Sequence, residues 1–170
     1  MSGPLLVVCC GLPGVGKSTV SAYIADERSA ARLRTDEVRH DLFENPSYTP
    51  DEGHRTYEEL FERTRDQLET GRDVVVDGTF KSARERNRAE TLAEETDSTV
   101  RFVHVTCPPA VVRERIQSRT DDASDADVSV YQKHRDQFES PARDHVTVDN
   151  SGDLADTYRQ VDRRLLADTE

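Results

Sequence analysis

Lysine, cysteine and long apolar runs are scarce in this chain of 170 residues, and each scarcity argues against a class of protein. No apolar stretch approaches the roughly 18 residues that a membrane span needs, and the short N-terminal apolar run is flanked wrongly for a signal peptide. The cysteines, at positions 9, 10 and 107, lack paired metal spacing and are expected to be buried thiols in a reducing compartment. We therefore expect a cytoplasmic protein without a membrane partner.

Basic residues are also in deficit. The chain has 34 acidic and 23 basic residues, a formal net charge of −11, and its basic residues are almost all arginine. An acidic, lysine-poor surface is typical of proteins from salt-loving organisms, so we expect a halophilic source. Because phosphate neutralisation weakens steeply with salt, this composition favours a small substrate over a nucleic acid. The guanine-specifying motif [NT]-K-x-D is absent, which argues against a GTPase switch and favours ATP over GTP.

The most informative stretch present, residues 11–19, reads GLPGVGKST and satisfies the P-loop pattern G-x-x-x-x-G-K-[ST]. It follows the apolar run 5–10, where a first strand is expected, so the match is positional as well as literal. Glycines let successive N–H groups point at phosphate oxygens, and the following helix presents its positive N-terminal end. Lys17 would reach the β- and γ-phosphates and the Ser18 hydroxyl would hold Mg²⁺. The residues expected to hold ATP are Gly11, Leu12, Pro13, Gly14, Val15, Gly16, Lys17, Ser18 and Thr19.

Strand and helix signals alternate along the chain. Short apolar runs predict strands at 5–10, 32–34, 74–77, 100–105 and 145–148. Periodic segments predict helices at 17–27, 35–43, 50–71, 82–95, 108–118, 125–138 and 153–166. Capping boxes are expected where Thr49 precedes Glu52 and where Ser82 precedes Glu85, and Thr35 is a further candidate cap. This alternation predicts one α/β domain over residues 1–170, with a parallel sheet covered on both faces and ligands at the carboxyl ends of its strands.

Polar side chains after two of these strands are candidates for metal and acceptor binding. Asp77 ends an apolar strand and either faces Mg²⁺ on the P-loop or forms a turn with the following glycine. Asp36 and Arg39 share one helix face at i, i+3 spacing. Phosphoryl transfer to an alcohol needs a carboxylate for the hydroxyl proton and a cation for an anionic acceptor, and this pair supplies both. The same spacing fits a surface ion pair at a helix start equally well.

Three arginines lie on or just after the helix expected at 108–118. Arg113, Arg115 and Arg119 lead into a polar segment, and arginines of a lid over about 113–125 could close over the triphosphate. The alternative is that they are solvated surface residues. We expect one or two of the three to act on the nucleotide.

The P-loop is one of an ordered set of motifs that covers nearly the whole chain. The others are Arg34–Arg39, Tyr48–Pro50, Val74–Phe80, Arg119 with Ala123–Asp127, and Val148–Ser151. This set resembles the small P-loop predicted kinases of the zeta-toxin and polynucleotide-kinase type, an AAA-type ATP-binding kinase family. The resemblance implies a parallel sheet of strand order 2-3-1-4-5 and transfer of the ATP γ-phosphate to a hydroxyl.

The same resemblance implies roles for individual residues. Asp36 matches the general base of the polynucleotide kinases, and Arg39 matches the residue that grips the acceptor phosphate. Asp77 matches an essential carboxylate, and Arg119 matches a lid arginine that acts on the transferred phosphoryl group. Asn150 would lie near adenine.

The chain departs from this pattern in two respects. Gly78 replaces the alanine common in the D-A-T-F motif, and neither the phosphatase domain of the phage enzyme nor the tRNA-binding domain of seryl-tRNA kinases is found. We expect an ATP- and Mg²⁺-dependent kinase that phosphorylates a hydroxyl of a small metabolite, nucleoside or sugar. The alternatives are a polynucleotide 5′-hydroxyl or aminoacyl-tRNA acceptor, and a nucleotide-dependent binding module with slow ATPase activity. The motifs specify neither the acceptor nor an oligomeric state.

Overall fold

The computed structural model describes residues 3–12, 15–47, 49–118, 132, 135, 138 and 145–166. Several sequence expectations lie wholly or mostly outside these residues. They are the helix at 125–138, the lid after residue 118, Pro13, Gly14, Tyr48 and Arg119. Within the described part of the chain, none of the helices combines the length and apolar character that a membrane crossing requires.

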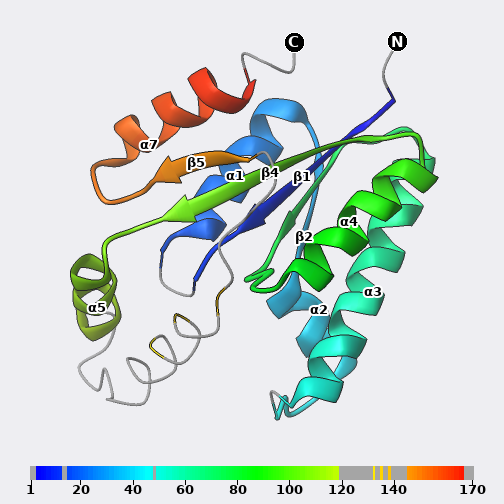
Figure 1. Cartoon of the computed structure of the whole chain (residues 1–170), viewed down its shortest axis with the longest axis horizontal. Helices are drawn as coiled ribbons and strands as arrows, with labels where there is room; N and C mark the ends of the chain where they lie inside the picture. Colours follow the sequence, from blue (N-terminus) through cyan, green and yellow to red (C-terminus); the bar gives the residue numbers. More distant parts are fainter. Residues whose placement is uncertain are drawn as a thin grey trace.

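Five parallel strands form one sheet in the order β2-β3-β1-β4-β5, which confirms the predicted order (Figure 1). They are β1 (Leu5–Cys10), β2 (Ala31–Arg34), β3 (Val74–Asp77), β4 (Thr99–Thr106) and β5 (Val146–Asp149). β1 is central, with Cys9 opposite Asp77 of β3, and Asp77 is in turn opposite Arg34 of β2. Because the strands are parallel, the ends of β1, β2 and β3 meet at one edge of the sheet, and the P-loop starts there.

Helices cover both faces of this sheet (Figure 1). The helical elements are α1 (Lys17–Arg28), α2 (Thr35–Leu42), α3 (Pro50–Glu69), α4 (Ala83–Glu95), α5 (Pro109–Ser118), α7 (Leu154–Val161) and the π-helical turn η1 (Asp162–Leu166). α1 and α7 pack on one face, and α3 and α4 pack on the other. α2 follows β2 directly and packs against α3, so that its first turn lies at the carboxyl edge of the sheet.

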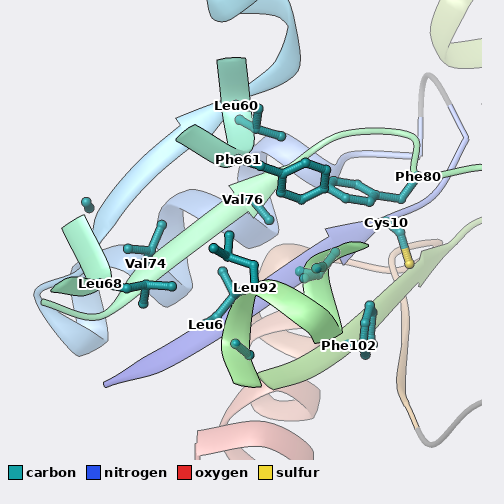
Figure 2. Close-up of a cluster of buried hydrophobic side chains, with 14 of the residues drawn as sticks. Leu6, Cys10, Leu60, Phe61, Leu68, Val74, Val76, Phe80, Leu92 and Phe102 are labelled. Atoms are coloured by element: carbon teal, nitrogen blue, oxygen red, sulfur yellow. The ribbon is translucent and has the colours of Figure 1, made fainter. Parts of the chain in front are cut away.

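Every residue of β1 is buried, and this explains its unbroken apolar sequence. Successive side chains of a strand point to opposite faces, so Val7 packs toward α1 and α7 whereas Leu6 packs toward α3 and α4. Figure 2 shows the second of these clusters, in which Leu60 and Leu68 of α3 and Leu92 of α4 lie over the sheet. A strand buried on both faces fixes the root of the P-loop rigidly.

The start of α3 departs from the predicted capping box. The Thr49 side chain accepts a hydrogen bond from the Glu52 N–H at 3.2 Å, as a cap should, and Pro50 is the first helical residue. The Glu52 carboxylate, however, does not return to Thr49 but binds Arg39 and the Ser47 N–H. A charged partner gives a stronger hydrogen bond than a neutral amide. The Glu52 carboxylate therefore pairs with Arg39, and the hydrogen bond from the Thr49 N–H to Glu52 that would complete the capping box does not form.

The caps of two other helices also differ from the expectation. At α4 the Ser82 hydroxyl donates to the Glu85 carboxylate instead of capping the backbone. Thr35 is the first residue of α2, and Arg34 takes the cap position without a side-chain cap bond.

The closing helix expected at 153–166 is α7 followed by η1. At that junction the Tyr23 hydroxyl donates to Asp162 at 2.6 Å, a contact 139 residues apart in sequence that no local pattern specifies.

Candidate active site

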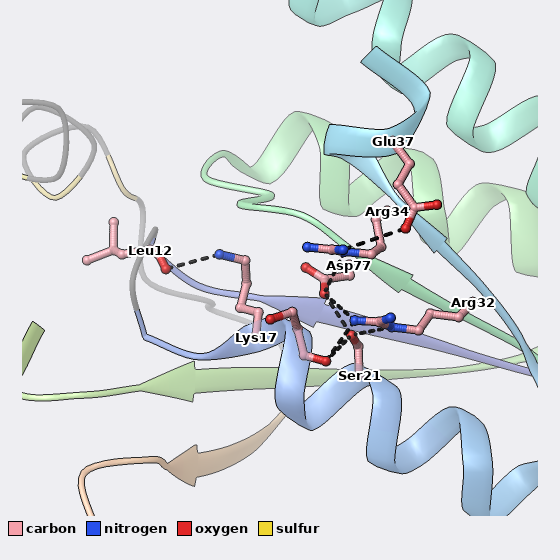
Figure 3. A network of polar contacts seen from close by, with 8 residues as sticks. Leu12, Lys17, Ser21, Arg32, Arg34, Glu37 and Asp77 are labelled. Atoms are coloured by element: carbon pink, nitrogen blue, oxygen red, sulfur yellow. Dashed lines mark hydrogen bonds and ion pairs between the residues drawn. The ribbon is translucent and has the colours of Figure 1, made fainter. Parts of the chain in front are cut away.

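The P-loop connects the end of β1 to the start of α1. Gly11 must be glycine because a Cβ there would lie 2.6 Å from the Val105 carbonyl oxygen. Gly16 precedes α1 with φ 92° and ψ 29°, a left-handed conformation that favours glycine. The Lys17 ammonium donates to the Leu12 carbonyl at 3.0 Å and so closes the loop on itself (Figure 3).

Asp77 lies on the α1 face of the sheet, within a cluster of polar side chains (Figure 3). Its carboxylate accepts a hydrogen bond of 2.7 Å from Ser21 of α1. Arg32 and Arg34 of β2 approach the same oxygen at 4.0 and 3.9 Å, and Arg32 also donates to the Ser21 hydroxyl at 3.0 Å. Asp77 is 6% exposed, so these partners provide the positive charge and the hydrogen bond that a buried carboxylate needs.

The neighbourhood of Asp77 also fits the predicted Mg²⁺ site. Ser21 donates to the Ser18 carbonyl at 3.2 Å as well as to Asp77, so the carboxylate lies against the first turn of α1, where Ser18 is exposed. No group of three or more His, Cys, Asp or Glu side chains among the described residues could hold a metal ion. Mg²⁺ at a phosphate site needs only one or two protein oxygens with phosphates and waters, and Ser18 and Asp77 are donors of that kind.

The electrostatic surroundings of Lys17 link the P-loop with the two predicted carboxylates. Burial lowers the pKa of its ammonium, and the carboxylates of Asp77 and Asp36 are the main groups that oppose this shift. Two negative charges thus act on the P-loop lysine from β3 and from α2. Asp36 is exposed in the first turn of α2, so its carboxylate is accessible to a substrate. The structure therefore brings the anion cradle and the predicted base to the same edge of the sheet.

Arg39, the predicted acceptor-binding residue, forms an ion pair with Glu52. Its Nη1 lies 2.9 Å from Glu52 Oε1, and the two side chains are only 14% and 7% exposed. The second oxygen of Glu52 accepts the Ser47 N–H at 2.8 Å. This pair ties α2 to the start of α3 and fixes the direction of the guanidinium. The sequence did not point to Glu52 in this role, because the capping box already explained it.

The turn after β3 is held by two contacts from the helical layer. Phe80 is buried at φ 44°, an uncommon conformation for a bulky residue. Its N–H donates to the Tyr57 hydroxyl at 3.1 Å and its carbonyl accepts from Arg86 Nε at 2.8 Å. Arg86 is 2% exposed, and Thr79 in the same turn accepts the Gly11 N–H at 3.3 Å. The turn that follows Asp77 is therefore joined to the P-loop.

The predicted nucleotide residues outside the P-loop lie at the end of β5. Arg115 donates through Nη2 to the Asn150 carbonyl at 2.6 Å. The Asn150 side chain is buried and bonded to Val15 and to Thr157 of α7. Arg113 donates to Gln132 at 3.1 Å and is exposed. Arg115 of α5 is therefore joined to Asn150, whose side chain in turn contacts Val15 of the P-loop.

The sequence motifs assigned no role to several residues of the site. Arg32 and Arg34 stand two apart on β2, so the period of a strand places both on the face of Asp77, and that signal could have been read from the sequence. Ser21 lies one turn after Ser18 on α1, which is a weaker signal of the same kind. Thr157 has none, because only the fold brings it against Asn150.

The fold and this site define the class of the protein as a P-loop protein with the fold of P-loop kinases. The chain belongs to the AAA_33 family of AAA domains, whose model matches residues 6–141. An uncharacterized protein of Mycobacterium tuberculosis strain H37Rv, Rv2004c, is 28% identical over 137 residues, which are 74% of this chain. The match covers only 28% of that relative's own length.

Solved structures with the same fold include three named proteins. A gluconokinase from Sinorhizobium meliloti superposes with a TM-score of 0.74 at 23% identity, covering 94% of this chain and 90% of its own. The Mycobacterium tuberculosis APS kinase CysC, in complex with AMPPNP and APS, gives a TM-score of 0.75 at 15% identity and coverages of 95% and 96%. The Pnkp1/Rnl/Hen1 complex contains a chain with a TM-score of 0.60 at 21% identity, covering 71% of this chain and 41% of that chain. At these identities the likeness establishes the fold alone.

Proposed function

We propose that this protein is an ATP- and Mg²⁺-dependent kinase that transfers the γ-phosphate to a hydroxyl of a small molecule such as a metabolite, nucleoside or sugar. The observation that carries the proposal is that Asp77 ends β3 and Asp36 lies in the first turn of α2, both at the edge of the sheet where the P-loop starts. A P-loop alone would suit an ATPase or a switch. An additional exposed carboxylate at the cradle is what transfer to an alcohol requires.

Each residue then has a defined role. Lys17 and the P-loop N–H groups hold the phosphates, and Asp36 accepts the proton of the attacking hydroxyl. Ser18 and Asp77 hold Mg²⁺, which when bound supplies positive charge at the β- and γ-phosphate oxygens. Arg39, fixed by Glu52, orients the acceptor. Catalysis by such a site is positioning combined with charge neutralisation.

A lid over about 113–125 completes the proposal. Arg115 donates to the Asn150 carbonyl, and Arg119, which lies outside the described residues, would act on the transferred phosphoryl group. A small acceptor is favoured over a nucleic acid by the net charge of −11, and locally by exposed carboxylates such as Asp36 and Glu37 in the first turn of α2. The names of the gluconokinase and APS kinase neighbours support the same substrate class.

Replacing Asp36 with asparagine tests the proposal. A panel of hydroxyl compounds is first screened for those that accelerate ADP formation, with 5′-hydroxyl oligonucleotides as a separate arm. In D36N we expect transfer to the best acceptor to fall by about 100-fold or more, because a general base contributes about that much. AMPPNP affinity, measured by calorimetry, should be no weaker than in the wild type, because Asp36 is assigned to the acceptor and its loss removes a negative charge near the phosphates.

Asp41 provides the matched control, since it is an exposed aspartate on the same helix that pairs only at the surface with Arg63. D41N should retain transfer. Equal transfer by D36N and D41N would remove Asp36 from the mechanism. ADP formation that no hydroxyl compound accelerates, and that D36N leaves unchanged, would replace the kinase with a nucleotide-dependent switch.

A further inference from the structure

Asn150 joins the end of β5 to the P-loop through its side chain. Its Nδ2 donates to the Val15 carbonyl at 2.8 Å, and its Oδ1 accepts from the Thr157 hydroxyl at 2.7 Å. The residue is 5% exposed. A carbonyl oxygen only accepts hydrogen bonds, so the atom that faces Val15 must be the amide nitrogen, and the orientation of the amide is settled.

The backbone of Asn150 is fixed as firmly as its side chain. Its N–H donates to the Thr106 carbonyl at 2.8 Å, and its carbonyl accepts from Arg115 at 2.6 Å. Both polar atoms of its side-chain amide are therefore engaged by protein groups on a fixed main chain. Such a residue is suited to hold another part of the protein in place.

The part that Asn150 holds is the peptide between Val15 and Gly16. In a planar trans peptide the C=O and the following N–H point in opposite directions. Because the Val15 carbonyl is directed at Asn150, the Gly16 N–H is directed away from the Asn150 side chain. Gly16 also packs so closely on the amide that a Cβ there would lie 2.1 Å from Asn150 Nδ2.

We infer that Asn150 is a positioning residue for the phosphate cradle: it holds the Val15–Gly16 peptide so that the Gly16 N–H faces the phosphates, and Thr157 orients the amide for this task. The inference rests on the proposed function, since it takes the P-loop as a triphosphate site. It differs from an adenine contact, because Asn150 acts here through the P-loop backbone. Its effect should therefore extend to a ligand that has no base.

Inorganic tripolyphosphate and AMPPNP, each with Mg²⁺, are the two probes, and calorimetry measures their affinities. In N150A the loss of the hydrogen bond to Val15 should weaken both probes by the same factor, about tenfold. The T157V variant keeps the side-chain shape but lacks the hydroxyl, and should weaken both by roughly three- to tenfold. The T157S variant keeps the hydroxyl and should bind both like the wild type. Thermal unfolding without ligand checks that each variant is folded.

Thr157 makes this test specific, because it touches Asn150 and not the P-loop in the described contacts. If N150A fails to fold, the T157V and T157S pair tests the inference instead. T157V should then weaken the binding of tripolyphosphate and of AMPPNP by the same factor, and T157S should weaken neither. Weaker AMPPNP binding with unchanged tripolyphosphate binding would show a base contact and overturn the inference, as would unchanged binding of both probes. A wild-type chain that bound neither probe would instead overturn the proposed function itself.

Discussion

Gly78 and Thr35 pack against each other so closely that a Cβ on Gly78 would lie 2.6 Å from Thr35 Cγ2. Gly78 follows Asp77 at the end of β3, and Thr35 is the first residue of α2, directly before Asp36. The glycine that departs from the D-A-T-F pattern thus makes room for the methyl group of a threonine in the neighbouring motif. This contact joins the end of the strand that carries the predicted metal ligand to the start of the helix that carries the predicted base.

Alanine at position 78 should therefore destabilise the protein. The added methyl group forces Thr35 and the first turn of α2 away, which should cost about 1–3 kcal/mol in the free energy of unfolding measured with urea. Removing the Thr35 methyl group in G78A/T35S should restore part of this loss, with a coupling energy of about 1 kcal/mol, because the added Cβ would still lie 3.2 Å from the Phe80 ring. Transfer activity should fall in G78A and recover in the double variant, because the position of Asp36 follows that of Thr35.

Gly53 supplies the control for this substitution. It lies within α3, and a Cβ there would meet nothing within 4 Å. G53A should raise the free energy of unfolding by about 0.4–1 kcal/mol, since alanine favours a helix and restricts the unfolded chain. Opposite signs for G78A and G53A would show that the effect at position 78 is steric. A neutral G78A, or additive effects in the double variant, would contradict the proposed contact.

A second prediction concerns Asp77 and Mg²⁺. In D77N the neutral amide removes a metal-binding oxygen but leaves the arginines Arg32 and Arg34 beside the site. The increase in AMPPNP affinity that Mg²⁺ gives the wild type should shrink by about 10- to 100-fold. In the presence of EDTA the variant should bind AMPPNP at least as tightly as the wild type, because one negative charge near the phosphates is gone.

Ser21 distinguishes a metal role of Asp77 from a structural one. S21A removes the 2.7 Å hydrogen bond to the carboxylate but keeps its charge, so the Mg²⁺ dependence should persist. Calorimetric titrations with and without Mg²⁺ measure both variants. If D77N kept the full Mg²⁺-dependent gain in affinity, Asp77 would be a turn-forming residue before Gly78 and not a metal ligand.

The elements of this fold could be predicted because their signals are local. The apolar residues of β1 are buried on both faces, and the alternation of short strands with helices allows few arrangements other than a parallel sheet. The strand order came with the motif resemblance. Helix starts were predicted to within one residue, but their capping bonds were predicted less well, since the Glu52 and Glu85 side chains each found a partner that competes with the capping geometry. Side-chain competition depends on tertiary structure, which a four-residue pattern does not contain.

The same distinction applies to the site. Lys17, Asp36 and Asp77 follow strands whose carboxyl ends meet in any sheet of this topology, so their convergence could be anticipated. The residues that hold Arg39 and Asn150 in place could not be anticipated in this way. Glu52 reaches Arg39 across the junction of α2 and α3, and Thr157 reaches Asn150 only because α7 folds back along β5. Motifs thus indicate the groups predicted to touch a ligand, whereas the groups that hold those in place are determined by packing.

The third prediction is a loss of stability in acid that depends on His104 of β4. Burial, reinforced by the neighbouring His145 and Arg86, lowers the pKa of the His104 imidazole from its ordinary value of 6.5 to about 4. The ring stacks on Phe138 with centroids 5.2 Å apart, and His145 lies 6.0 Å away. Between these two pKa values the unfolded chain binds a proton that the folded chain does not. The free energy of unfolding therefore decreases as the pH falls from about 6.5 to about 4.

Each unit of the pKa difference corresponds to 1.36 kcal/mol, so His104 should account for at most about 3 kcal/mol of this decrease. H104Q should be less stable than the wild type at pH 7.5, because the stacked ring is lost, but should lose less stability on going to pH 4.5. The measurement is the difference in the free energy of unfolding between the wild type and H104Q at each pH, determined with urea. Taking the difference removes the contribution of the carboxylates, because these titrate in both proteins. H40Q, at an exposed histidine of α2, should follow the wild type. Parallel pH profiles for the wild type and H104Q would mean that His104 is protonated in the folded protein as readily as in the unfolded chain.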